Sequence, residues 1–249
     1  MGPGIVDPDD APVTLGPKVA TTPSMSQLDV YSDVACPWCF IGKRRLDQAL
    51  AALPERERPT VRWHAYQLQP DFPLGEAKPA RAMLEAKFGG AARFAQMFER
   101  VQAIAAQEGI HYDLDRQQAV NTSLAHRAVA IARRYGKESA AVEAFFAAFF
   151  EQGHNLADVD VVAAILARAL ADVPGIDAAG LAQQLRDGAG EDEVQADLKD
   201  ARLLGVSGVP FFILDERLAI SGAQDVTTFL SFLAEGQRRR GGGDPAQTA

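Results

Sequence analysis

The order of hydrophobic patterns along the chain predicts an α/β fold that carries a large helical insertion. A strand, a helix and a second strand follow one another within the first 68 residues. Helical spacing then dominates residues 78–205, and strand character returns at 209–222 before a last amphipathic helix at 225–235. Two strands joined by a helix normally form a right-handed β-α-β unit. The predicted order is therefore β-α-β, a helical block, and β-β-α.

The first unit rests on three segments. Residues 28–34 mix β-branched and aromatic side chains at strand spacing. Apolar residues then recur near helical spacing over 40–53, and Pro54 ends that helix. Residues 61–68 alternate imperfectly between apolar and polar side chains, as expected of a strand that is covered on both faces.

The middle of the chain reads as successive helices separated by breakers. Gly136, Gly153, Pro174 and Gly205 stand between stretches with helical periodicity. After them, residues 209–214 and 218–222 flank a short polar turn and predict a hairpin. These stretches share no fixed period, so no repeat architecture is expected.

These patterns predict two folded parts and two tails. Residues 27–77 and 206–236 would form one α/β domain, and 78–205 a helical domain inserted into it. Residues 1–26 and 237–249 offer little that can pack, so both ends are expected to be disordered. Met25 is a candidate for the true start of the chain.

Composition excludes several classes of function. The chain has 249 residues, 47% hydrophobic and 23% charged, with a formal net charge of −8. This acidic balance argues against a nucleic-acid partner. No apolar run approaches the ~20 residues that cross a bilayer, and the first 26 residues lack the apolar core of a secretion signal. The expectation is a cytoplasmic protein without a membrane partner.

The two cysteines form the motif that carries chemistry. Cys36-Pro37-Trp38-Cys39 opens the first helix directly after a strand. Side chains three apart on a helix lie close together, within a modest adjustment of disulfide range. Unpaired amides and the helix dipole at the helix start favour a thiolate, so we expect a lowered pKa for Cys36, which would act as nucleophile. Cys39, one turn inward, would resolve mixed disulfides.

The residues between the cysteines fit this interpretation. Pro37 suits the first turn, where its missing N–H costs little, and Trp38 is expected to shape the rim around the sulfurs. Structural zinc needs about four ligands, and two cysteines with four scattered histidines lack a second pair, so no metal is expected. Inert buried thiols remain an alternative to redox chemistry.

Together, SDVACPWCFIGKRRL and GVSGVPFFI resemble the DsbA-like thioredoxin-fold oxidoreductases, specifically the FrnE-like branch. The resemblance covers about residues 27–236. It implies an α/β thioredoxin fold (βαβ…ββα) with a large all-helical insertion. It also implies a cis Pro210 facing the dithiol, with the backbone of Val209 exposed to pair with a peptide or glutathione. The alternative is a trans proline that begins an edge strand.

The resemblance adds secondary site candidates. Asn121 and His126 match an Asn-x-x-x-x-His stretch that lies near the active-site cleft in the family. By residue type alone, Asn121 is a helix cap and His126 a surface or partly buried helix residue. Gln224 and Asp225 fall where glutathione-using relatives hold the γ-glutamyl end, and Asp225 equally suits an N-cap.

Three further groups are interpreted from position. Asp33, three residues before Cys36, would either exchange protons with a thiol or sit in a solvated loop. Lys43, Arg44 and Arg45 are interpreted as a solvated helix face. The spacing of four phenylalanines predicts core packing of their helix; they are Phe145, Phe146, Phe149 and Phe150.

Three functions remain open at this point. The first is thiol–disulfide exchange on a protein or small-molecule substrate, with no resident cofactor and with glutathione as a candidate co-substrate. The second is a glutathione-dependent isomerase or transferase of the 2-hydroxychromene-2-carboxylate isomerase and kappa-class type, which the chain also resembles; those relatives commonly have Ser at the position of Cys36. The third is a non-catalytic holdase or partner-binding module. A homodimer is an open alternative in each case.

Overall fold

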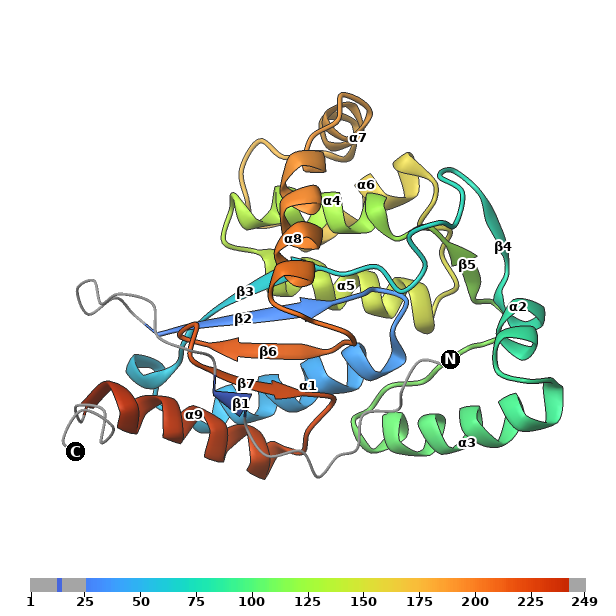
Figure 1. The fold of residues 1–249 in the computed structure, drawn as a ribbon. Helices are drawn as coiled ribbons and strands as arrows, with labels where there is room; N and C mark the ends of the chain where they lie inside the picture. The colour runs from blue at the N-terminus through green and yellow to red at the C-terminus, as the bar shows by residue number, and fades with distance from the viewer. Residues whose placement is uncertain (1–12, 15–25, 242–249) are drawn as a thin grey trace.

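A mixed five-stranded sheet forms the centre of the computed structural model, which describes residues 13–14 and 26–241 (Figure 1). The strands run in the order β1-β7-β6-β2-β3. Only β2 and β3 pair in parallel among these strands, and the other pairs are antiparallel. The strands are β1 (Val13–Thr14), β2 (Gln27–Ser32), β3 (Thr60–Ala65), β6 (Phe211–Leu214) and β7 (Leu218–Ser221).

Strand alternation gives this sheet two apolar faces. Leu28, Val30 and Phe212 belong to the main hydrophobic core, where Phe212 meets Phe229 edge-on. That core includes the two helices α1 (Pro37–Ala52) and α9 (Val226–Gly241), which pack against each other. Tyr31 and Ile213 point the other way, into a smaller cluster with Ala201 of α8 (Glu191–Leu203). Because successive side chains of a strand face opposite sides, both layers follow from the sequence pattern.

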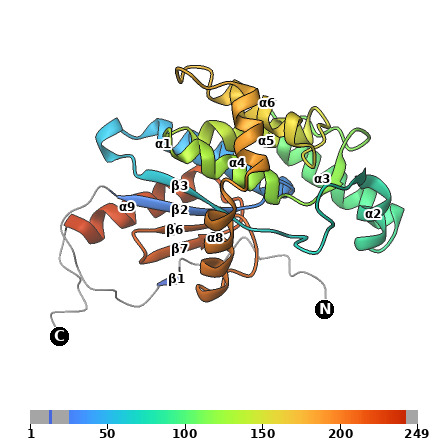
Figure 2. The ribbon, with the colours of Figure 1, turned by 90° about the horizontal axis from the view of Figure 1, so that it is seen from above.

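The insertion packs beyond the β3 edge of the sheet (Figure 2). Its helices α4, α5 and α8 contact β3. A short antiparallel ladder interrupts the helices, pairing β4 (Ala77–Pro79) with β5 (Gln118–Val120), so the insertion is not helical throughout. The remaining elements are η1 (Glu55–Glu57), α2 (Ala80–Lys87), α3 (Ala91–Gln107), α4 (Ser123–Arg133), α5 (Glu138–Phe150), α6 (Val159–Ala169) and α7 (Ala178–Arg186). The predicted class, an α/β thioredoxin fold with an inserted helical region, is confirmed.

Aromatic packing joins the insertion to the first helix. The four phenylalanines of α5 are buried, as their spacing predicts. Phe40 of α1 stacks on Phe146 with ring centroids 5.0 Å apart, and it also stacks on Phe150. The helix that begins with the dithiol therefore shares one core with the inserted helices.

Both predicted tails include residues that form regular secondary structure. Val13 and Thr14 pair with β7, because the outer edge of that strand offers unpaired backbone groups. Residues 237–241 continue α9, where Gln237 donates to the carbonyl of Glu57 and Arg240 pairs with Asp215. Ser26 is also described, and its hydroxyl donates to Asp215. The remaining residues of the two predicted tails, with Met25, lie outside the described residues.

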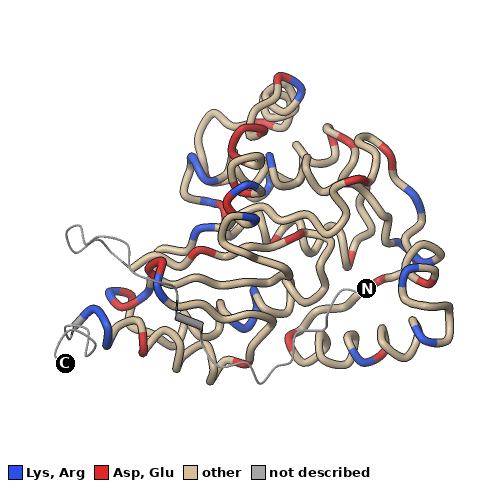
Figure 3. The backbone as a smooth tube through the Cα atoms, in the orientation of Figure 1, with Lys and Arg blue, Asp and Glu red and all other residues tan. Residues whose placement is uncertain are grey.

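The basic residues of α1 are not a solvated face, which corrects the prediction. Lys43 is only 4% exposed and lies 2.6 Å from Asp47 and 3.1 Å from Glu143. Arg44 pairs with Glu143 as well, and Arg45 pairs with Glu108 at 2.6 Å. The insertion covers this side of α1 and supplies Glu108 and Glu143. In the described residues, basic and acidic side chains are interspersed over core and insertion (Figure 3).

A buried histidine links the sheet to the insertion. His64 on β3 has Nδ1 2.7 Å from Asp197 of α8 and Nε2 2.7 Å from Asp29 of β2. Burial by itself lowers the pKa of His64, but the hydrogen bonds to Asp197 and Asp29 raise it above its ordinary value. Both nitrogens then donate, and the imidazolium holds two carboxylates that would otherwise repel each other.

We expect His64→Gln to destabilise the fold by about 3 kcal/mol, because the buried carboxylates of Asp29 and Asp197 lose the imidazolium between them. The raised pKa fixes the pH dependence. The stabilisation is fully present below the unfolded histidine pKa and is lost as pH rises through the folded pKa. Thermal unfolding from pH 6 to pH 9 should therefore show the largest difference from wild type at pH 6. A constant difference across this range would contradict the assignment.

Candidate active site

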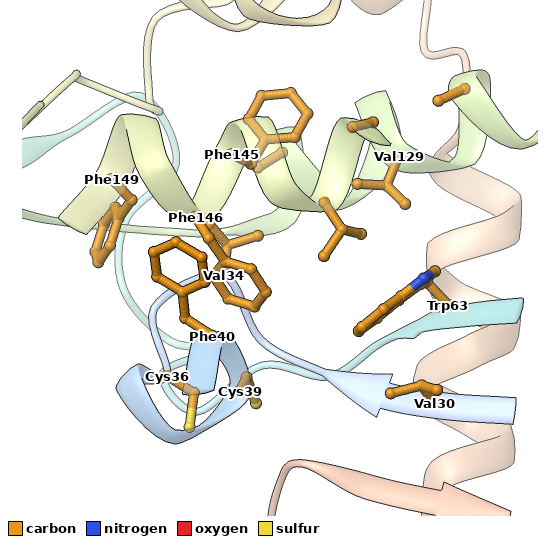
Figure 4. Close-up of a cluster of buried hydrophobic side chains, with 14 of the residues drawn as sticks. Val30, Val34, Cys36, Cys39, Phe40, Trp63, Val129, Phe145, Phe146 and Phe149 are labelled. Atoms are coloured by element: carbon orange, nitrogen blue, oxygen red, sulfur yellow. The ribbon is translucent and has the colours of Figure 1, made fainter. Parts of the chain in front are cut away.

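The two cysteines occupy the first turn of α1 (Figure 4). Cys36 is the N-cap residue and Pro37 the first helical residue, as the motif predicts. Both cysteines are free thiols. Cys36 is 4% exposed and Cys39 is 1% exposed, while Trp38 between them is 37% exposed. Trp38 is therefore the exposed residue of the motif, and both sulfur-bearing side chains are buried.

The segment before β6 lies directly against this turn. The peptide bond between Val209 and Pro210 is cis, the feature that the resemblance implies. The thiol of Cys36 donates to the carbonyl oxygen of Val209 at 3.5 Å. One turn farther along α1, a Cβ added to Gly42 would lie 3.1 Å from Cγ of Pro210. Glycine at position 42 therefore allows the close approach of helix and proline.

The two thiols have different surroundings. Burial is the main cause that raises the pKa of the Cys39 thiol well above its ordinary value, and a hydrogen bond with Cys36 raises it further. The Asp33 backbone and the Ser32 hydroxyl act in the opposite direction without offsetting burial. The Cys39 thiol is therefore held in its protonated form.

Asp33 is a buried carboxylate, not a solvated loop residue. It is 1% exposed and accepts hydrogen bonds from the amides of Ala35 at 3.2 Å and Leu68 at 2.7 Å. His126 Nε2 lies 3.4 Å from Asp33 Oδ1. The insertion and the loop after β3 close over this carboxylate, which no local pattern in the sequence could reveal.

The other predicted residues have mainly structural contacts. The side-chain oxygen of Asn121 accepts from the amide of Ser123 at 3.0 Å, and its nitrogen donates to the carbonyls of Pro70 and Phe72, so it orders the start of α4 and the loop after β3. Gln224 donates to Ser221. Asp225 accepts from the amide of Thr228 at 2.7 Å, which lowers its pKa, and this fits the capping alternative.

Tyr112 is a site residue that sequence reasoning missed. Its hydroxyl donates to the carbonyl oxygen of Pro37 at 2.7 Å, and its ring packs against Phe150. Burial raises the pKa of Tyr112 far above its ordinary value, with further contributions from Cys36 and Cys39. The residue stands in an irregular stretch after α3, where neither periodicity nor spacing marks it.

A cavity of about 720 Å³ opens on the other side of Tyr112. Phe94 and Phe98 of α3 join Tyr112 in its wall, and Arg81, Asp115 and Glu151 contribute charged groups to it. Tyr112 therefore lines this cavity and also contacts the first turn of α1, where its hydroxyl donates to Pro37.

Comparison with known proteins agrees with this geometry. A family model described as a DSBA-like thioredoxin domain matches residues 27–234. The chain belongs to this DsbA-like family. The match spans β2, β3, β6 and β7, the helix that begins with the dithiol, and the whole insertion.

Three solved structures show which proteins this DsbA-like protein is similar to. It shares 32% identity and a TM-score of 0.78 with a probable DsbA oxidoreductase from Streptomyces coelicolor, over 86% of this chain and 91% of that one. A cytosolic disulfide reductase, DsbM from Pseudomonas aeruginosa with GSH, gives 18% identity and a TM-score of 0.57, covering 85% and 99% of the two chains. A 2-hydroxychromene-2-carboxylate isomerase gives 17% and 0.56, covering 86% and 97%. The last two show the fold alone.

One curated protein also has a similar sequence. An uncharacterized protein of Bacillus subtilis (strain 168), YwbO, is 24% identical over 86% of this chain and 98% of its own length.

In the described part of the DsbA-like chain, no group of three or more His, Cys, Asp or Glu residues is arranged to hold a metal ion. Within the same residues, no helix has the length and apolarity to cross a membrane.

For this DsbA-like protein we expect Gly42→Ala to slow the reaction of Cys36 with a small disulfide by about tenfold. The added methyl group must push α1 away from the rigid ring of Pro210. Stopped-flow kinetics with an aromatic disulfide measures this. Gly208→Ala is the matched control, because nothing lies within 4 Å of a Cβ at that position. Equal rates for the two variants would contradict the role of Gly42.

Tyr112→Phe should lower the free energy of unfolding by about 1 kcal/mol, because the Pro37 carbonyl loses a buried donor while the ring contacts stay. Chemical denaturation measures this loss. Tyr135→Phe is a comparison that leaves the Pro37 contact intact. An unchanged stability in Tyr112→Phe would show that the hydrogen bond contributes nothing net.

Proposed function

We propose that this protein is a thiol–disulfide oxidoreductase of the FrnE-like type. Cys36 attacks a substrate disulfide and forms a mixed disulfide, releasing one substrate thiolate. Cys39 then attacks Cys36, which releases the second substrate thiol and leaves a Cys36–Cys39 disulfide. Oxidation of a substrate dithiol is the reverse sequence.

The observation that carries this proposal is the asymmetry of the two sulfurs beside Val209. Cys36 caps the positive end of α1 and lies 3.5 Å from the Val209 carbonyl. Cys39 is buried one turn deeper, and burial raises its pKa. The first sulfur is thus placed to meet a substrate, and the second is reserved for the step after the mixed disulfide has formed.

The surroundings support a peptide or small-thiol substrate. We propose that Pro37, Trp38, Val209 and Pro210 form the contact surface, with Val209 pairing through its backbone to an extended substrate. Asn121, Gln224 and Asp225 keep their structural contacts in this proposal, and glutathione binding near Gln224 and Asp225 stays a prediction.

Glutathione is the proposed reductant that returns the dithiol. In a reducing cytoplasm the pair rests reduced, which favours reductase or isomerase work over oxidation. The similarity to a cytosolic disulfide reductase whose structure was solved with GSH supports this choice. Cytoplasmic location and a homodimer remain predictions.

Insulin reduction coupled to glutathione turnover tests the function. We expect Cys36→Ser to abolish activity, because Cys36 makes the first attack. Cys39→Ser should keep the first attack and accumulate mixed disulfides, which non-reducing mass spectrometry detects. Full activity in Cys36→Ser would overturn the proposal.

The same variants separate the alternatives. Conjugation of glutathione to an electrophile that survives Cys39→Ser would favour the transferase or isomerase class. Suppression of aggregation that is unchanged when both cysteines are replaced would favour the holdase.

A further inference from the structure

Two buried polar atoms behind the dithiol lack a hydrogen-bond partner. They are Oγ of Ser32, which is 5% exposed, and Nε2 of His126, which is 7% exposed. Both residues line one small cavity of about 10 Å³, between the sheet and the insertion. That volume suits a single water molecule, and a buried water needs polar partners of this kind. A buried polar group without a hydrogen-bond partner lowers the stability of the fold, so two such groups on one cavity need an explanation.

Ser32 connects this cavity to the resolving cysteine. Its hydroxyl acts on the Cys39 thiol, where it opposes the effect of burial on the pKa. It does so without forming a hydrogen bond of regular geometry. A hydroxyl can receive a proton on one side and release its own on the other. Ser32 is therefore positioned as the first step of a proton path that leaves Cys39.

His126 and Asp33 form the far end of this path. Asp33 accepts two backbone N–H groups, from Ala35 and Leu68. The distance of 3.4 Å between His126 Nε2 and Asp33 Oδ1 is longer than a charge-assisted hydrogen bond. A proton arriving on Nε2 would convert the contact into a charge-assisted hydrogen bond.

The other charged groups around the cavity already have hydrogen-bond partners. Both ring nitrogens of His64 face carboxylates, one of them from Asp197. Arg133 donates to Glu138 and to the carbonyl oxygen of Trp63. The α5 side of the cavity is apolar, formed by Val142 and Phe146. Among the described residues that line the cavity, His126 is the base with an unused nitrogen.

We propose that His126 accepts the proton of Cys39 when the mixed disulfide is resolved, through the Ser32 hydroxyl and one water molecule. This proposal rests on the proposed function. As the proton leaves Cys39, its sulfur bonds to Cys36, the Cys36–substrate bond breaks, and the substrate sulfur departs as a thiolate with the electron pair. The dithiol is oxidised and the substrate disulfide reduced by the same two electrons. His126 later returns the proton to the thiolate or to solvent.

The reaction with an excess of an aromatic disulfide separates the two steps. The first release of aromatic thiolate depends on disulfide concentration and reports the attack of Cys36. The second release is independent of that concentration and reports resolution by Cys39. We expect His126→Gln to slow the second release at neutral pH by about tenfold or more and to leave the first unchanged.

The pH profile distinguishes proton acceptance from a structural role. In wild type the second rate should reach a plateau near neutral pH, because His126 takes the proton of Cys39 there. In His126→Gln this rate should keep rising as Cys39 ionises unaided. Ser32→Ala, which leaves both His126 and Asp33 in place, should give the same profile and covers the case in which His126→Gln does not fold.

His64→Gln is the matched control, because it changes a second buried histidine of the same cavity whose nitrogens are both bonded. Its profile should keep the wild-type plateau at temperatures where it is folded. A wild-type profile in both Ser32→Ala and His126→Gln would overturn this proposal while leaving the dithiol function intact. Absence of the first release in wild type would instead overturn the proposed function.

Discussion

The approach of the first turn of α1 to the cis Val209–Pro210 peptide is the constraint on which the rest of the structure depends. The contact joins Cys36 to a carbonyl 173 residues away in sequence. It requires α1 and β6 to pack on one sheet, and it requires glycine at position 42, where a methyl group would crowd Pro210. Because β2 and β6 are neighbours in the sheet, the strand that leads into α1 and the strand that follows Pro210 fix this contact from both sides.

The insertion completes the site from the other side. Tyr112 holds the Pro37 carbonyl, and Phe146 packs on Phe40 directly after the dithiol. His126 approaches the Asp33 carboxylate from α4. Cys39 belongs to the same buried hydrophobic cluster as Phe146 of the insertion, and burial raises the pKa of its thiol.

The two cysteine side chains are chemically identical, and their surroundings make them different. A thiol in water ionises near the same pH wherever it stands, and only its surroundings distinguish one from another. Cys36 meets the helix terminus and the Val209 carbonyl, whereas Cys39 meets Ser32 and the backbone of Asp33. Under the proposed function the buried thiol needs a route for its proton, which would connect the packing of the insertion to the chemistry of the dithiol.

The sequence by itself determined the order β-α-β, helical block and β-β-α, the position of the dithiol at a helix start and the core role of the α5 phenylalanines. Each of these depends on local spacing, which reports the element in which a residue stands. The tertiary structure alone decided that Lys43 and Asp33 are buried, that Val13–Thr14 extends the sheet, and that Tyr112 reaches Pro37. Periodicity does not specify which distant segment covers a given face, so burial, pairing and the contacts of irregular stretches follow only from the assembled chain.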